Sequence, residues 1–132
     1  MKFFMALFLG VAATAFAAGT PPREIEMKTE KIGEVVHWMP ENIEVTQGET
    51  VKITAKHDLE GGFDFHGLFI PELKISEKVD RHKPTVVTKK IPAKLKAGSY
   101  KVQCQFHPKH APANLVVKAA EKKSDEPEKK TR

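Results

Sequence analysis

Short runs in which apolar and polar residues alternate cover most of this chain. Residues 43–45 and 51–55 place isoleucine, valine or alanine at every second position and polar residues between them. Each run can therefore turn one side to a core and the other side to water. Residues 47–49, Gln-Gly-Glu, separate the two runs and have the composition of a turn. A period of two residues is the period of a β-strand and restricts the chain to a β-rich fold.

Three more segments, residues 85–88, 99–104 and 114–118, also have the composition of strands. The second of them follows a turn signal at residues 96–98. No segment combines a convincing 3.6-residue period with caps at both ends. Short strands separated by turns at a spacing of roughly ten residues predict an all-β fold, an antiparallel Greek-key β-sandwich.

Composition divides the chain into three parts. Residues 1–17 begin with a positive charge, continue with an apolar run shorter than the roughly 20 residues of a membrane-spanning helix, and end in a small-x-small pattern typical of cleavage sites. Residues 119–132 are mostly charged and have almost nothing to bury. We therefore predict a signal peptide over residues 1–17, one domain over 18–118 and a disordered tail over 119–132. This organisation implies a periplasmic or secreted protein without a membrane span.

Cys104 is the only cysteine of the chain, so an exported protein offers it no partner for an internal disulfide. His107 and His110 follow it at the end of the alternating run. One soft thiolate with imidazoles three and six residues further on is suited to copper. The alternative is that Cys104 is a small buried hydrophobe and that the two histidines are solvated loop residues.

Three stretches resemble the cupredoxins, the small copper-binding β-sandwich proteins. Residues 40–53 look like the opening hairpin of the family. Residues 66–73, His-Gly-Leu-Phe-Ile-Pro-Glu-Leu, are similar to a histidine-bearing stretch in the copper domain of cytochrome oxidase subunit II. Residues 97–100, followed by Cys-Gln-Phe-His-Pro at 104–108, look like the family's closing strand and ligand loop.

The resemblance implies one copper ion per chain and suggests its ligands. The first imidazole falls on His66, the thiolate on Cys104 and the second imidazole on His107, a set that makes the trigonal site used for electron transfer. Many members of the family carry a weak axial methionine where this chain has His110. We therefore include His110 as a possible axial ligand.

A second alignment offers a competing ligand. Residues 104–109 also resemble nitrosocyanin, a red copper protein with a carboxylate ligand, and Glu60 falls on that carboxylate if one glycine is inserted. We favour His66 because residues 66–73 match without a gap. The remaining histidines lack a partner at ligand spacing and are expected not to bind the metal: His37, His57 and His82.

The resemblance implies an electron carrier that cycles between Cu(II) and Cu(I). Its partners would be larger redox proteins such as cytochromes or oxidases, bound transiently. We expect the exposed edge of His107 to be the contact, within an apolar frame made of Phe106, Pro108, Ala111 and Pro112. The formal net charge of +5 favours an acidic partner or a membrane surface, and export argues against nucleic acid.

Two other functions remain open. One is a nitrosocyanin-like small-molecule redox enzyme or sensor, and the other is a copper carrier that passes Cu(I) on. A hydrolase built on Cys104 and His107 would need a larger scaffold with an oxyanion site and a substrate cleft.

Overall fold

The computed structural model describes residues 20–121, which form β-strands joined by turns and one 3₁₀ turn. The predicted signal peptide and residues 122–132 of the predicted tail lie outside this range. In chain order the elements are β1 (Arg23–Ile32), β2 (Val35–Met39), β3 (Asn42–Thr46), β4 (Thr50–Lys56), β5 (Phe65–Ile70), η1 (Pro71–Leu73), β6 (Ile75–Asp80), β7 (Thr85–Lys90), β8 (Gly98–Val102) and β9 (Ala113–Lys118). Within residues 20–121, no helix has the length and apolar character needed to cross a membrane.

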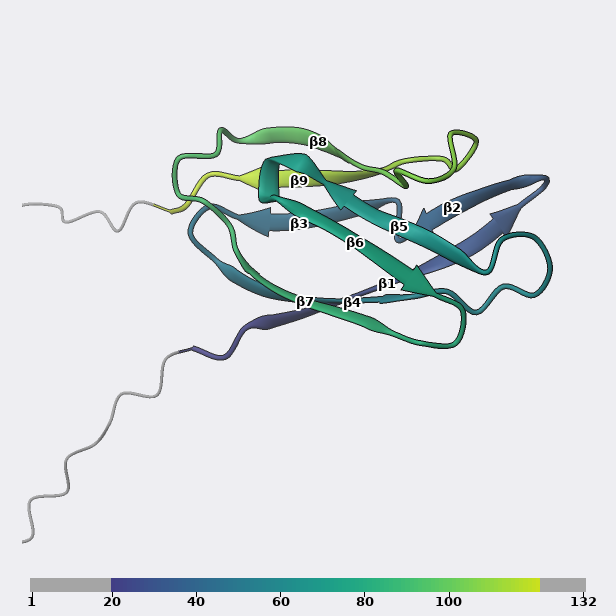
Figure 1. Cartoon of the computed structure of the whole chain (residues 1–132). Helices are drawn as coiled ribbons and strands as arrows, with labels where there is room; N and C mark the ends of the chain where they lie inside the picture. Colours follow the sequence, from purple (N-terminus) through teal and green to yellow (C-terminus); the bar gives the residue numbers. More distant parts are fainter. Residues whose placement is uncertain (1–19, 122–132) are drawn as a thin grey trace, which may run out of the picture.

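The strands form two main layers (Figure 1). One sheet has the order β2-β1-β4-β7 and the other the order β3-β9-β8, while β5 and β6 form a separate ribbon. A bridge between Phe69 and Gln103 joins this ribbon to the segment after β8. The predicted all-β sandwich is confirmed. Its sheets are mixed, because β1 pairs with β4 and β3 with β9 in parallel, and an alternating pattern carries no information on strand direction.

The core lies between the layers and is filled from alternate positions of the strands. In β4 the side chains of Val51, Ile53 and Ala55 are fully buried, and the residues between them are partly exposed. Ile43 and Val45 of β3 are buried in the same way. This inward set matches the alternation in the sequence, so the hydrophobic effect determines which side of each strand faces the core.

The turn predicted at residues 47–49 is present between β3 and β4. Gly48 has a φ of 77°, in the left-handed region that glycine adopts without strain. The Glu49 N–H donates to the Thr46 carbonyl oxygen over 3.1 Å, and the Glu49 carboxylate accepts from the Thr46 N–H over 2.9 Å. Glu49 also pairs with Arg23 at 2.6 Å, which ties the start of β1 to this turn.

Three connecting segments come together at one end of the sandwich (Figure 1). They are the β1–β2 hairpin, residues 57–64 between β4 and β5, and residues 103–112 between β8 and β9. The Ala111 N–H donates to the Val36 carbonyl oxygen over 2.8 Å, which ties the last segment to β2. Both ends of the described chain lie at the opposite end of the molecule. Four of the residues considered above lie in the last two of these segments: His57, Cys104, His107 and His110. His66 lies in β5 just after residues 57–64, His82 contacts Asp58 and Glu60 of that segment, and His37 lies in β2.

Truncation of the core should show how strongly the central strand depends on packing. Ile53→Ala removes a fully buried side chain, so the free energy of unfolding should fall by about 2–5 kcal/mol. Val86→Ala on β7 is the matched control, because Val86 is 54% exposed and its loss should change stability by no more than about 0.5 kcal/mol. Urea unfolding of both metal-free variants measures the difference, and equal losses would contradict the assignment of the core.

Candidate metal centre

The structure brings the four predicted ligands together in one cluster. His66 belongs to β5, and Cys104, His107 and His110 belong to the segment between β8 and β9. The Nδ1 atom of His66 lies 3.2 Å from Nδ1 of His110 and 3.3 Å from Nδ1 of His107. The Sγ atom of Cys104 lies 3.5 Å from Nδ1 of His107 and 4.0 Å from Nδ1 of His66. Donor atoms of His66, Cys104 and His110 all lie within 4.8 Å of one another.

These separations fit a shared metal ion. Two nitrogen ligands at about 2.0 Å from a tetrahedral ion lie about 3.3 Å apart, close to the spacing of the imidazole nitrogens. All four side chains are buried, the most exposed being Cys104 at 9%. Buried polar groups need partners, and these nitrogens mainly face one another, where protons on both members of a pair would repel. One soft thiolate with imidazoles is a donor set that suits copper.

Burial keeps the imidazoles neutral. Desolvation, followed by the positive charge that His110 would carry, lowers the pKa of His66 from 6.5 to about 3. Desolvation and then the charge on His107 lower the pKa of His110 from 6.5 to about 4, and desolvation also lowers the pKa of His107. A neutral imidazole has a free lone pair, so the histidines are ready to bind a metal at neutral pH.

Neighbouring groups hold the sulfur and one imidazole in place. The Gly67 N–H donates to Sγ of Cys104 over 3.1 Å, and the indole N–H of Trp38 donates to the Gly67 carbonyl oxygen over 3.0 Å. The fully buried Trp38 ring also stacks on His110, with ring centres 5.5 Å apart. Nε2 of His110 is buried without a hydrogen-bond partner among the described residues. Packing therefore holds His110, whereas a hydrogen bond orients the thiol.

The expectation that an edge of His107 is exposed is wrong. His107 is only 8% exposed, because the Phe63 ring stacks on it with ring centres 3.7 Å apart and an angle of 19° between the planes. Phe63 itself is 60% exposed and forms the outer surface here. The fold of residues 57–64, which local sequence patterns do not predict, places this ring over the imidazole.

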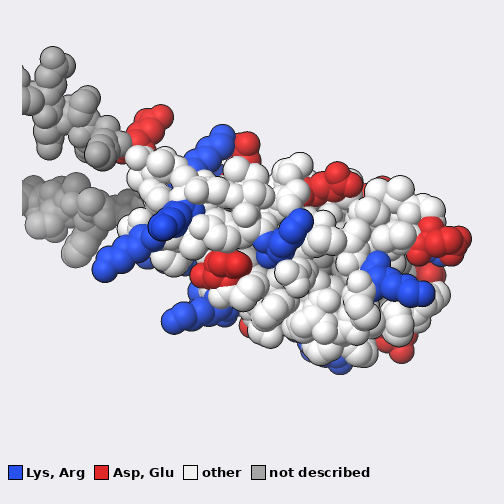
Figure 2. All heavy atoms as spheres, turned by 90° about the horizontal axis from the view of Figure 1, so that it is seen from above, with Lys and Arg blue, Asp and Glu red and all other residues white. Residues whose placement is uncertain are grey.

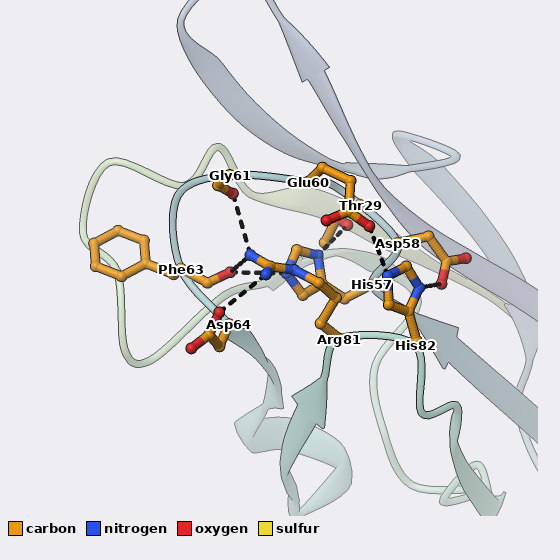
Figure 3. A network of polar contacts seen from close by, with 9 residues as sticks. All are labelled: Thr29, His57, Asp58, Glu60, Gly61, Phe63, Asp64, Arg81 and His82. Carbon is orange, nitrogen blue, oxygen red and sulfur yellow. Dashed lines mark hydrogen bonds and ion pairs between the residues drawn. The ribbon is translucent and has the colours of Figure 1, made fainter.

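Glu60 lies outside the donor cluster. Its carboxylate contacts Nε2 of His82 at 2.7 Å, and Asp58 contacts Nδ1 of the same ring at 3.2 Å (Figure 3). The buried His57 has both nitrogens in other contacts, to the Thr29 hydroxyl at 2.8 Å and the Phe63 carbonyl oxygen at 2.9 Å. His37 in β2 lies 3.9 Å from a Glu41 carboxylate oxygen.

The sequence interpretation missed three residues that shape the centre: Trp38, Gly67 and Phe63. Gly67 follows His66 directly, and a Cβ atom at this position would lie 2.6 Å from Cδ of Gln105, so a side chain here would require Gln105 to move. That glycine and the Gly-Gly-Phe run at residues 61–63 were the available signals. For Trp38, distant in sequence from every predicted ligand, no local signal existed.

The fold and the cluster define a small all-β metal protein. Residues 2–117 match the family described as the cupredoxin-like domain, and the chain belongs to this family. Family membership and the His-Cys-His cluster together make one copper ion its cofactor. No curated protein matches the chain in sequence.

Solved structures share the fold at low sequence identity. Auracyanin A from Chloroflexus aurantiacus, described as a blue copper protein, is 17% identical with a TM-score of 0.54, over 74% of this chain and 99% of that one. The metal-binding domain of the Cu(I)-exporting P-type ATPase CopA from Streptococcus pneumoniae D39 is 17% identical with a TM-score of 0.57, over 72% and 84%. Auracyanin B is 11% identical with a TM-score of 0.58, over 76% and 92%.

The buried imidazoles should make the metal-free protein sensitive to acid. The pKa values of His66 and His110 are lower in the folded chain than the ordinary 6.5, so below pH 6.5 the unfolded chain binds protons that the folded chain does not. Stability should therefore be complete above pH 6.5 and fall toward pH 4, with each such group contributing up to about 1.4 kcal/mol per pH unit.

Chemical unfolding of the metal-free protein between pH 7 and pH 5 measures this slope. His66→Gln should make the slope shallower. His82→Gln should not, because the hydrogen bonds that the His82 ring donates to the carboxylates of Glu60 and then Asp58 raise its pKa. An unchanged slope in the His66 variant would show that His66 has the same pKa in the folded and the unfolded chain.

Proposed function

We propose that this chain is an electron-transfer protein whose copper ion is held by His66, Cys104, His107 and His110. The observation that carries the proposal is the buried cluster of four donors at one end of a strand framework. Copper supplies a one-electron cycle between Cu(II) and Cu(I). The other steps depend on what the protein's own residues do.

The framework supports repeated cycling because strands and backbone hydrogen bonds hold the donors in place. His66 lies in a hydrogen-bonded strand, and the Gly67 N–H orients the sulfur of Cys104. The segment that carries the other three donors is joined to β5 by the Phe69–Gln103 bridge and to β2 by the Ala111 N–H, and such rigid support keeps a site in its geometry. Burial also leaves the donors little contact with water, so little solvent has to rearrange when the charge changes.

His110 is the best candidate for the weak axial position. A metal-bound imidazole usually donates its second N–H to an acceptor, which raises its basicity, and Nε2 of His110 has no such partner among residues 20–121. Cys104, His66 and His107 then form the trigonal set. An imidazole nevertheless remains a stronger donor than the methionine that many cupredoxins carry at this position.

An apolar groove next to Phe63 is where we propose that redox partners dock. It has a volume of ≈ 470 Å³ and is lined by Phe63, Phe65, Phe106, His107, Pro108 and Lys109. Phe106 is 44% exposed, and Phe63 places an aromatic ring between His107 and solvent. Small apolar contacts of this kind suit brief complexes with larger redox proteins such as cytochromes or oxidases.

Charge would contribute little orientation beyond this groove. Figure 2 shows basic and acidic side chains interspersed on the visible face. Several lysines are paired there or elsewhere on the surface, such as Lys52 with Glu24 at 3.1 Å and Lys118 with Glu44 at 2.8 Å. Lys109 at the groove is the better candidate for salt-dependent attraction.

We also propose that the protein lies in the periplasm, with residues 1–17 as its signal peptide.

A small opening beside the donors favours one alternative, a small-molecule redox enzyme or sensor. A cleft of ≈ 170 Å³ reaches His66, His107 and His110, with Glu34, Val36, Phe63 and Lys109 as its other walls. Binding of azide or nitrite to the copper form would support this function. Rapid loss of Cu(I) to a chelating acceptor, without reversible redox cycling, would instead indicate a copper carrier.

The thiolate should account for the colour of the copper form. The purified protein should bind one copper per chain and show an intense visible charge-transfer band. Cys104→Ser should abolish this band, because the chain has no second cysteine. Glu60→Ala is the matched control: Glu60 contacts His82, so its loss should leave the band unchanged. A strongly coloured Cys104→Ser protein would remove the basis of the assignment.

The character of the axial ligand should appear in the reduction potential. An imidazole favours Cu(II) more than a thioether does, so His110→Met should raise the potential and move the colour toward blue. Voltammetry and the electron paramagnetic spectrum of the Cu(II) form measure both effects. If neither changes, His110 is not a ligand and its contact with Trp38 is only structural.

A further inference from the structure

The segment that covers His107 is a loop closed by backbone hydrogen bonds. At its C-terminal end the Arg81 N–H donates to the Asp64 carbonyl oxygen over 2.8 Å. At its N-terminal end the His82 N–H donates to the His57 carbonyl oxygen over 2.9 Å. Residues 57–64 are therefore held at both ends by the residues that follow β6.

The side chain of Arg81 fills the inside of this loop (Figure 3). Its Nη2 donates to the carbonyl oxygens of Phe63 and Gly61, over 3.1 Å and 3.3 Å. Its Nη1 pairs with the Asp64 carboxylate at 3.0 Å. The Phe63 carbonyl oxygen also contacts Nε2 of the buried His57 at 2.9 Å, so two side chains hold one peptide group. A planar guanidinium can make these contacts together, which a single ammonium group cannot.

The backbone of the loop needs such a partner. Gly61 and Gly62 both have positive φ, 75° and 72°, and two successive left-handed residues turn the chain sharply. The turn directs carbonyl groups of the loop toward its inside, where the guanidinium binds them. Loss of the guanidinium would leave these carbonyls without their charged donor.

Phe63 cannot hold its own position firmly. Phe63 is 60% exposed as a residue, so burial against His107 gives only part of the stabilisation of a core aromatic residue. Its place over the imidazole therefore depends on the backbone to which it is attached. The same ring forms one wall of the cleft that reaches His66 and His110.

We infer that Arg81 is a positioning residue for the copper centre: it holds residues 57–64 so that Phe63 covers His107 and limits the access of outside ligands to the metal. Arg81 contacts none of the four donors itself. The ligands it excludes are chelators and anions that approach along the cleft. This inference rests on the proposed copper site.

Removal of Cu(I) from the full chain by an anionic chelator, bathocuproine disulfonate, tests the inference. Arg81→Gln should accelerate removal roughly tenfold or more, the scale expected when hydrogen bonds to a charged group are lost. Phe63→Ala should accelerate it similarly, and the double variant should be no faster than the faster single variant. Arg81→Lys should be intermediate. Lys83→Gln is the matched control, since the Lys83 side chain is exposed and two residues from Arg81.

Two results would overturn the inference. One is an unchanged rate in Arg81→Gln, and the other is a double variant whose acceleration is the product of the single ones, because Arg81 would then not act through Phe63. Should Arg81→Gln fail to fold, the exposed Phe63→Ala variant and Arg81→Lys still decide the question. Unchanged removal rates in both variants would show that Phe63 does not limit access to the metal.

Hydrogen exchange in the metal-free protein separates this inference from the proposed function. In Arg81→Gln the His82 amide, which closes the loop, should exchange faster than in the parent chain, while the Phe69 amide in β5 stays protected. Unchanged exchange of the His82 amide would contradict the inference that Arg81 holds residues 57–64 in place. If the parent chain binds no copper, the proposed function fails, and this measurement still reports on the loop.

Discussion

The metal centre depends on one pair of backbone hydrogen bonds. The Phe69 N–H donates to the Gln103 carbonyl oxygen and the Gln103 N–H donates to the Phe69 carbonyl oxygen, each over 2.9 Å. This bridge attaches the two-stranded β5–β6 ribbon to the segment that follows β8. The bridge is antiparallel, so His66, which precedes Phe69, and Cys104, which follows Gln103, lie on the same side of it. It brings Sγ of Cys104 to 4.0 Å from Nδ1 of His66 although the two residues are 38 positions apart in the chain. Together with the hydrogen bond from the Gly67 N–H to Sγ of Cys104, the bridge places the donor of the ribbon beside the three donors of the loop.

Assembling these donors has a cost that the rest of the structure must offset. Three imidazoles and a thiol are buried, and burial lowers the pKa of each histidine, so the folded state disfavours their charged forms. The packed core between the sheets supplies the stability that tolerates this. A metal that binds only the folded chain would add to it by mass action. The same burial that weakens the metal-free protein leaves the donors little contact with water.

Much of the fold could be predicted from the alternating pattern, because apolar and polar residues at alternate positions indicate which side of a strand faces the core and which faces water. The inward side of β4 and the turn at Gly48 follow from neighbouring positions alone. The parallel pairs β1–β4 and β3–β9 could not be read in this way. They join segments that are distant in the chain, and the period of a strand is the same in either direction.

For the candidate site, the sequence by itself determined which donors are available and which of them lie together. Cys104, His107 and His110 share one short segment, so any compact path of that segment keeps them close, and the motif alone indicated copper. Only the tertiary structure decided that His107 is covered, that Glu60 pairs with His82, and that Arg81 supports Phe63. These contacts join side chains from different loops. Their geometry depends on how the sheets bring those loops to one end of the sandwich, and no local pattern encodes that.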